Sequence, residues 1–121
     1  MKILTGFAAA VVIFSAGAAC AAPVEVYRAR LSEQDHFNSN GERLRTVAGV
    51  IRQDRANFHR FGMRDREDTD DDFFASADNR QRLEELLLRG TISGRDRAEI
   101  LNGDPLVVVR VYRHYVDVEV Q

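Results

Sequence analysis

Two runs of alternating valines close the chain and constrain its fold more than any other feature. The first run ends at Val111, the second begins at Val116, and the valines of the two runs have opposite parity. Because successive side chains of a strand point to opposite faces, one regular strand cannot carry both runs on the same face. We therefore expect two strands joined by a turn near 113–115, in preference to one long strand bent by a bulge.

A short β-prone segment at 24–31 and three helical patterns precede these strands. The helical patterns cover 41–59, the leucine-rich stretch after Asp78, and a short segment ending at Leu101. Each begins with a cap-like pair of residues, namely Ser39 with Glu42, Asp78 with Gln81, and Ser93 with Asp96. Glycines at 62, 90 and 103 are expected to end them. This order predicts an α+β fold, in which a small antiparallel sheet (the N-terminal strand plus the C-terminal strands) is covered by two to three helices.

An uncharged segment lies ahead of this domain. Lys2 is followed by an apolar centre at 7–14 (FAAAVVIF) and then by small residues as far as Ala22. This order is typical of a secretory signal peptide, and Ala19-Cys20-Ala21 fits the A-x-A cleavage rule. We expect a cleavable signal peptide over 1–21 and a single exported domain over 22–121, which places the protein in the periplasm or outside the cell.

Two alternatives to cleavage stay open. The uncharged stretch is long enough to cross a bilayer core of about 30 Å, so it could serve as an uncleaved anchor. Cys20 could also carry a lipid, although Gly17 stands where bacterial lipoprotein signals usually have leucine.

Composition excludes several functional classes. The chain has 17 basic and 19 acidic residues, and its net charge of −2 does not suit a nucleic-acid-binding domain. Cys20 is the single cysteine, so the exported domain is expected to be free of disulfides and of a cysteine nucleophile. Lys2 is the single lysine, which excludes a lysine Schiff base in the exported domain. The sequence contains no HExxH, CxxC, GxSxG, P-loop or GxGxxG motif.

Polar residues concentrate on the 32–40 segment and on the end of the first helical pattern. Residues spaced three and four apart on a helix share a face, so this end could present a hydrogen-bonding strip beside aromatic rings. The binding residues that this hypothesis selects are His36, Asn38, Asp54, Arg55, Asn57, His59 and Arg60. The alternative is an ordinary helix end, in which Phe58 and Phe61 enter the core while the neighbouring cations complement the helix dipole.

The acidic segment 65–72 contains the spacing Asp68-x-Asp70-x-Asp72, which opens a calcium-binding loop. An EF-hand also needs glycine at its sixth position and glutamate at its twelfth, and Phe73 and Asn79 stand there instead. The EF-hand is excluded. A looser site for calcium or magnesium on the three aspartates is the remaining metal hypothesis, and a solvated loop without metal is its alternative.

The leading functional hypothesis is a small exported bacterial envelope protein, a non-catalytic binding or accessory module with no membrane span after cleavage. Its partner would be an envelope protein or a small ligand, and Asp54→Ala or Arg55→Ala should leave the fold intact while abolishing partner capture. One alternative is a small secreted hydrolase, which needs His36, His59 or His114 to converge with acidic residues in a pocket. A cation-responsive envelope protein, acting through the acidic segment, is the third hypothesis.

Overall fold

A three-stranded antiparallel sheet forms one layer of the domain, in the order β1-β2-β3. The computed structural model describes residues 10–11 and 21–121, so most of the predicted signal peptide lies outside the described residues. Strand β1 spans Glu25–Arg30, β2 spans Leu106–Val111 and β3 spans Val116–Val120. The N-terminal strand pairs with β2, which pairs with β3, and this confirms the predicted α+β architecture.

A tight turn joins β2 to β3. Val111 lies opposite Val116, and the backbone N–H of Tyr112 donates to the carbonyl of Tyr115 at 2.9 Å. The rings of these two tyrosines stack with their centroids 4.4 Å apart. Because the turn lies between the two runs, the alternating valines of both runs lie on the same face of the sheet, the face covered by helices, as expected. Their buried members are Val107, Val109, Val111, Val116 and Val118.

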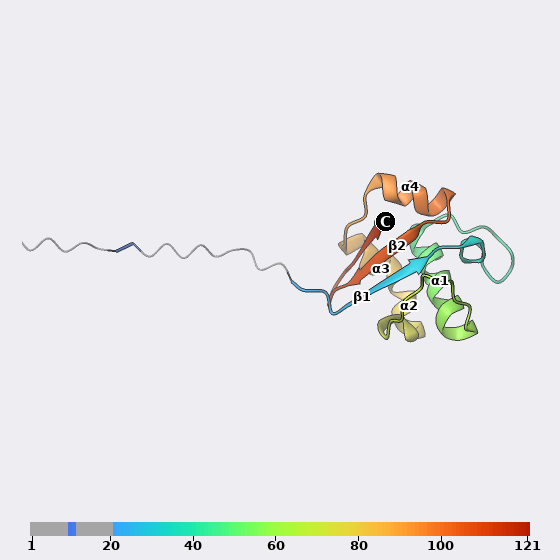
Figure 1. The fold of residues 1–121 in the computed structure, drawn as a ribbon, viewed down its shortest axis with the longest axis horizontal. Coiled ribbons are helices and arrows are strands. Elements are labelled where there is room, and N and C mark those ends of the chain that lie inside the picture. Colours follow the sequence, from blue (N-terminus) through green and yellow to red (C-terminus); the bar gives the residue numbers. More distant parts are fainter. Residues whose placement is uncertain (1–9, 12–20) are drawn as a thin grey trace, which may run out of the picture.

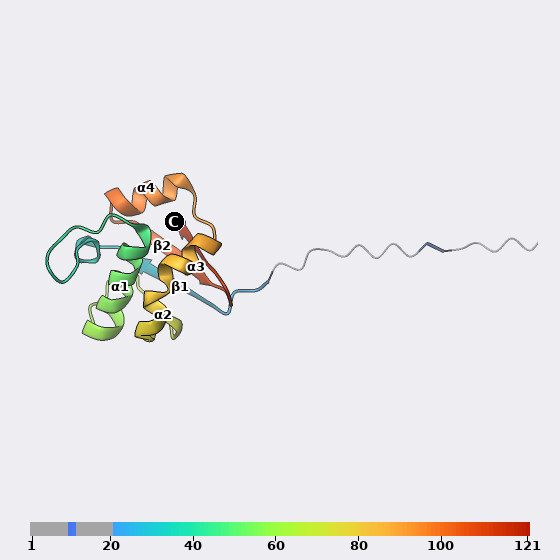
Figure 2. The ribbon, with the colours of Figure 1, turned by 180° about the vertical axis from the view of Figure 1, so that it is seen from behind.

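Helices form the second layer, on one face of the sheet. They are α1 (Val47–Phe61), α2 (Ala77–Gln81), α3 (Leu83–Arg89) and α4 (Gly94–Asn102), with short 3₁₀ helices η1 (Glu33–His36) and η2 (Phe73–Ala75). Helices α1 to α3 lie behind the sheet in Figure 1 and in front of it in Figure 2. The core between the layers includes Leu31, Val50, Ile51, Phe74, Leu86 and Ile100. Within the described part of the chain, no helix has the length and apolar character needed to cross a bilayer.

Helix α1 begins later than the sequence predicts. Its N-cap is Thr46, whose hydroxyl accepts the N–H of Gly49 at 3.0 Å, whereas the pattern predicted a start near residue 41 capped by Ser39. The Asn38 side chain instead accepts the N–H groups of Asn40 and Glu42 and closes a turn there. This side-chain-to-backbone bonding competes with helix formation.

The other helix signals are largely confirmed. Gly62 ends α1 in the left-handed conformation (φ 67°), which glycine adopts without strain. Ser93 caps α4 by accepting the N–H of Asp96 at 3.0 Å, as expected. Asp78 is not the cap of α2, because Ser76 takes that role by accepting the N–H of Asn79.

The acidic segment covers the outer edge of β1. Thr69 donates its N–H to the carbonyl of Arg28, and its hydroxyl accepts the N–H of Arg28 at 2.7 Å. Asp68 accepts the next outward N–H, that of Arg30, at 2.8 Å. An uncovered edge strand can pair with other chains, so this cover protects the sheet. The segment is therefore pinned to the fold along part of its length, which the solvated-loop alternative did not anticipate.

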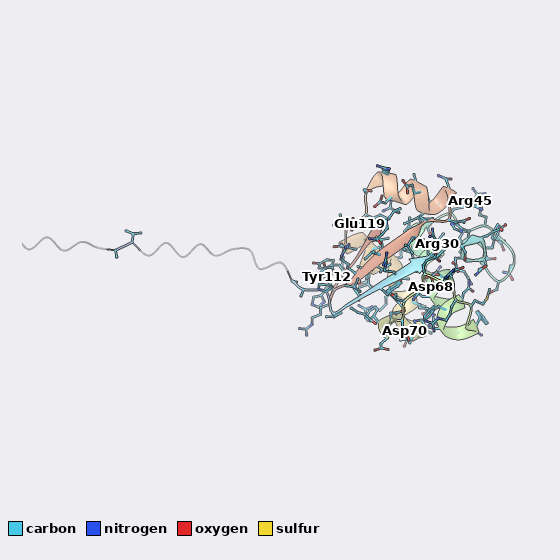
Figure 3. The ribbon with its side chains drawn as sticks, viewed as in Figure 1. Arg30, Arg45, Asp68, Asp70, Tyr112 and Glu119 are labelled. Carbon is cyan, nitrogen blue, oxygen red and sulfur yellow. The ribbon has the colours of Figure 1, made fainter. Side chains whose placement is uncertain are left out.

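The sheet face turned away from the helices carries mainly charged side chains, with the aliphatic Val26 and Val108 among them. Figure 3 shows Arg30 and Glu119 on this face. Val108 lies at its centre and is only 6% exposed, between its cross-strand neighbours Arg28 and Glu119. Long charged side chains can cover an apolar neighbour with their stems while their charges stay in water.

We expect Gly90→Ala to destabilise the protein by about 1–3 kcal/mol, the usual cost of forcing atoms into a packed site. Gly90 follows α3, and a Cβ atom there would lie 1.8 Å from the carbonyl oxygen of Val116. The glycine thus ends α3 where the chain passes against β3, and its φ of −97° shows that a left-handed conformation is not the reason. Thermal unfolding measures the loss. Gly94→Ala is the control, because no atom lies within 4 Å of its added Cβ.

Candidate functional site

The inward face of α1 carries charged and polar side chains that are buried. Asp54, Arg55 and Asn57 are all buried, and Arg55 is 0% exposed. Charged residues are almost never fully buried unless they are paired. The partners of these residues therefore decide what the face can do.

Two carboxylates and two aromatic rings enclose the guanidinium of Arg55. Its Nε donates to Asp54 at 2.8 Å, and its Nη1 donates to Asp71 at 2.7 Å. The ring centroids of Tyr27 and Phe58 lie 4.2 and 4.4 Å from the guanidinium carbon. A desolvated cation gains attraction from aromatic faces at such distances. The arrangement joins α1 to β1 and to the acidic segment.

Two polar atoms of this group are not hydrogen-bonded to any described residue. They are Arg55 Nη2 and the hydroxyl of Tyr27, and both are buried. Burial raises the pKa of Tyr27 well above its usual value, so this phenol stays neutral. Burial by itself lowers the pKa of Arg55, but the carboxylates of Asp54 and Asp71 outweigh it and the net shift is upward.

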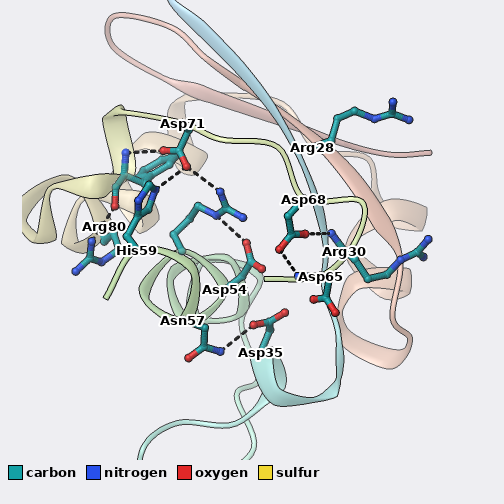
Figure 4. A network of polar contacts seen from close by, with 12 residues as sticks. Arg28, Arg30, Asp35, Asp54, Asn57, His59, Asp65, Asp68, Asp71 and Arg80 are labelled. Carbon is teal, nitrogen blue, oxygen red and sulfur yellow. Dashed lines mark hydrogen bonds and ion pairs between the residues drawn. The ribbon is translucent and has the colours of Figure 1, made fainter. Parts of the chain in front are cut away.

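Asp71 connects this centre to the end of α1. Its Oδ1 also bonds His59 Nε2 at 2.7 Å, and its Oδ2 accepts the backbone N–H of Phe74 at 2.8 Å. The carboxylate is therefore bonded on both oxygens. In Figure 4, dashed lines join Asp71 and Asp54 to the guanidinium between them, and a separate dashed line joins Asp35, which lies beside Asp54, to Asn57.

Asp35 extends the network to η1. It accepts from the amide of Asn57 at 2.8 Å and from the backbone N–H of Ser32 at 2.9 Å. Burial raises the pKa of Asp35 and, more strongly, that of Asp54, and the charge of Asp35 adds to the rise at Asp54. Two adjacent buried carboxyl groups resist being ionised together, so they are suited to share one proton.

The remaining predicted binding residues do not join this network through their side chains. His36 is buried, and its ring nitrogens lie 2.9 and 2.8 Å from the carbonyl oxygens of Ser32 and Ile100. Asn38 closes the turn described above. Arg60 lies on the exposed side of α1, with its guanidinium carbon 5.1 Å from the ring centroid of Phe61. The structure thus separates the seven selected residues into a buried group, a turn and an exposed arginine.

Four of the seven residues of the proposed contact strip do not lie at the surface. His36, Asp54, Arg55 and Asn57 are buried, so a partner cannot reach them in this conformation. The sequence pattern assigned these side chains to the exposed face because aspartate, asparagine and arginine normally face water. It did not detect that Tyr27 and Asp71, distant along the chain, supply the other side of a buried network.

Two of the three aspartates of the metal hypothesis bond to different backbone groups through their side chains. Asp68 accepts the N–H groups of Arg30 and Asp65, and Asp70 accepts the N–H of Asp71. Asp72 is exposed. Over residues 10–11 and 21–121, no cluster of three or more histidine, cysteine, aspartate or glutamate side chains is arranged to hold a metal ion. The geometry therefore adds no support to the calcium or magnesium hypothesis.

The hydrolase hypothesis requires a histidine and acidic residues in one accessible pocket. His59 does meet Asp71, but the Asp71 side chain is 0% exposed and both of its oxygens are occupied. The ring nitrogens of His36 lie against two backbone carbonyls, and His114 lies in the exposed β2–β3 turn. The His59–Asp71 contact is therefore better suited to stabilising the fold than to transferring a proton to a substrate.

Comparison with known proteins identifies no matching family, no similar curated protein and no similar solved structure.

The exposed side of α1 faces a hollow that the sequence did not predict. It has a volume of about 270 Å³ and lies between α1 and α2. The side chains that give it its chemistry, referred to below as the arginine hollow, are Arg52, Gln53, Arg60, Phe61, Arg80 and Gln81. Among the described residues that line it, none is acidic. Arg60 belonged to the predicted binding set, whereas Arg52 and Arg80 lacked a sequence signal because α2 approaches α1 only in the folded chain.

Proposed function

We propose that this chain is a small exported envelope protein that acts as a non-catalytic binding or accessory module, with the arginine hollow as its contact site. The observation that carries the proposal is the division of polar groups between the two sides of α1. The groups capable of acid–base chemistry are buried and bonded to one another, while the arginines on the other side are accessible. Such a division supports recognition more than catalysis.

The accessible side has the properties of a contact surface. Phe61 is 53% exposed, although its ring is large and apolar. Arginine and aromatic residues are enriched where proteins bind partners. The buried network then has a supporting role, since it fixes α1 against β1 and the acidic segment and so holds the contact residues in place.

Affinity capture from envelope extract tests this proposal. We expect the mature protein to retain a specific protein or small molecule, and Arg52→Glu with Arg60→Glu to reduce its capture by about tenfold or more, because hot-spot arginines contribute at least 2 kcal/mol. The intact mass of the endogenous protein should correspond to residues 22–121, as expected for cleavage after Ala21.

Arg113→Glu is the matched control, because Arg113 is an exposed arginine in the β2–β3 turn, outside the arginine hollow. Equal capture by the wild type and the Arg52/Arg60 variant would rule out this site. A mass that includes the first 21 residues would contradict cleavage.

A further inference from the structure

The three arginines of the hollow are not neutralised by any acidic side chain in the described part of the chain. Other arginines do form ion pairs, as in Arg30–Glu67, Arg89–Glu85 and Arg110–Glu119. Arg52, Arg60 and Arg80 form none with the described residues. Asp78, the acidic residue of α2, lines a different hollow beside α3. A chain with net charge −2 thus gathers three uncompensated positive charges at one concave place.

One of these arginines is already held in position. Arg80 Nη1 donates to the carbonyls of Phe74 and Ala75 at 2.8 and 3.1 Å. No described residue accepts from the Nε or Nη2 atoms of Arg80. A guanidinium fixed on one side loses less conformational freedom when its other donors bind an anion.

The size and lining of the hollow limit its occupant. Pockets for drug-sized ligands have volumes of about 300–1,000 Å³, so a hollow of about 270 Å³ fits a smaller molecule. Gln53 and Gln81 add neutral hydrogen-bonding groups, and the exposed ring of Phe61 adds an apolar wall beside Arg60. Arginine binds phosphate oxygens with two parallel hydrogen bonds.

We infer that the arginine hollow binds a small dianion of the phosphate monoester type, with the phosphoryl group against the arginines and an apolar or aromatic substituent against Phe61. This inference rests on the proposed function and adds the class of ligand. Three positive charges favour a dianion over a monocarboxylate, because Coulomb attraction scales with the charge of the ligand.

Titration of the mature protein with inorganic phosphate, phenyl phosphate and acetate, followed by amide NMR, tests the inference. We expect saturable shifts within 52–61 and 77–81, with a Kd on the order of 1 mM for inorganic phosphate. Phenyl phosphate should bind several-fold more tightly than phosphate, and acetate about tenfold more weakly. Phe61→Ala should remove the advantage of phenyl phosphate without changing the affinity for inorganic phosphate.

The charge variants complete the test. Arg52→Gln with Arg60→Gln should weaken phosphate binding about tenfold or more, equivalent to about 1.4 kcal/mol, while Arg113→Gln should leave it unchanged. Equal affinity in the wild type and the double variant, shifts confined to residues that do not line the hollow, or acetate binding as tightly as phosphate would each overturn the inference. If extract capture succeeds but phosphate neither binds nor competes, the ligand class is wrong and the binding function stands. If nothing is captured from extract, the proposed function fails whatever the titration gives.

Discussion

Arg55→Ala is expected to destabilise the protein by about 3–5 kcal/mol, the usual cost of removing one partner from a buried ion pair. The truncation leaves the carboxylates of Asp54 and Asp71 buried without their cation, and it also opens the space between Tyr27 and Phe58. Domains of this size are stable by only about 5–15 kcal/mol, so a large part of the total would be lost. Urea unfolding followed by circular dichroism measures the change.

Arg52→Ala is the matched control for this loss. Arg52 lies one helical turn before Arg55 on the exposed side of α1, and such surface changes usually stay within about 0.5 kcal/mol. Equal unfolding midpoints for the two variants would show that the buried Arg55 contributes no more to the stability of the protein than the exposed Arg52. The sequence-based hypothesis expected an intact fold for Arg55→Ala, so the same measurement separates a contact residue from a structural one.

The stability of the protein is expected to decrease as the pH rises above about 4, the pKa of an unfolded aspartate. Burial raises the pKa of Asp35 and of Asp54 in the folded state, whereas an unfolded aspartate has a pKa of about 3.9. The folded state therefore binds more protons above about pH 4. Each extra bound proton makes the free energy of unfolding fall by about 1.4 kcal/mol per pH unit, until the pH passes the raised pKa.

Urea unfolding at a series of pH values measures this dependence. Asp35→Asn leaves one ionisable group in the pair, and we expect its stability to decrease less steeply with pH than that of the wild type. Asp78→Asn serves as the control, because Asp78 is exposed on α2 and should keep the wild-type slope. Parallel pH profiles for the wild type and Asp35→Asn would contradict a proton shared between Asp35 and Asp54.

Local patterns were sufficient for most of the fold. The parity change between Val111 and Val116 predicted the β2–β3 turn, because the alternation of side chains in a strand is a property of the backbone. Ser93 and Gly62 marked helix ends through bonds and conformations that involve only neighbouring residues. The predicted start of α1, near residue 41, was wrong because the Asn38 side chain forms a local turn that competes with the helix.

The candidate site was predicted less well, since its members come together only through tertiary structure. Asp71 was read as one acid among several in a loop, but it lies against Arg55 and His59, 16 and 12 positions away in the sequence. Tyr27 lay within the predicted strand 24–31 and was given no part in the candidate site. The spacing of polar residues on a helix gives their shared face, but it does not reveal whether that face meets water or buried counter-charges.

By itself, the sequence determined the helices, strands and α+β class of this protein, because periodicity and capping act over a few residues. The tertiary structure decided which side of α1 is buried, since the burial of Arg55 depends on carboxylates and rings from other segments. It also brought Arg80 of α2 beside Arg52 and Arg60. The physical reason is the same for both: a charge is stable inside only where distant partners compensate it, and it stays available to a ligand only where they do not.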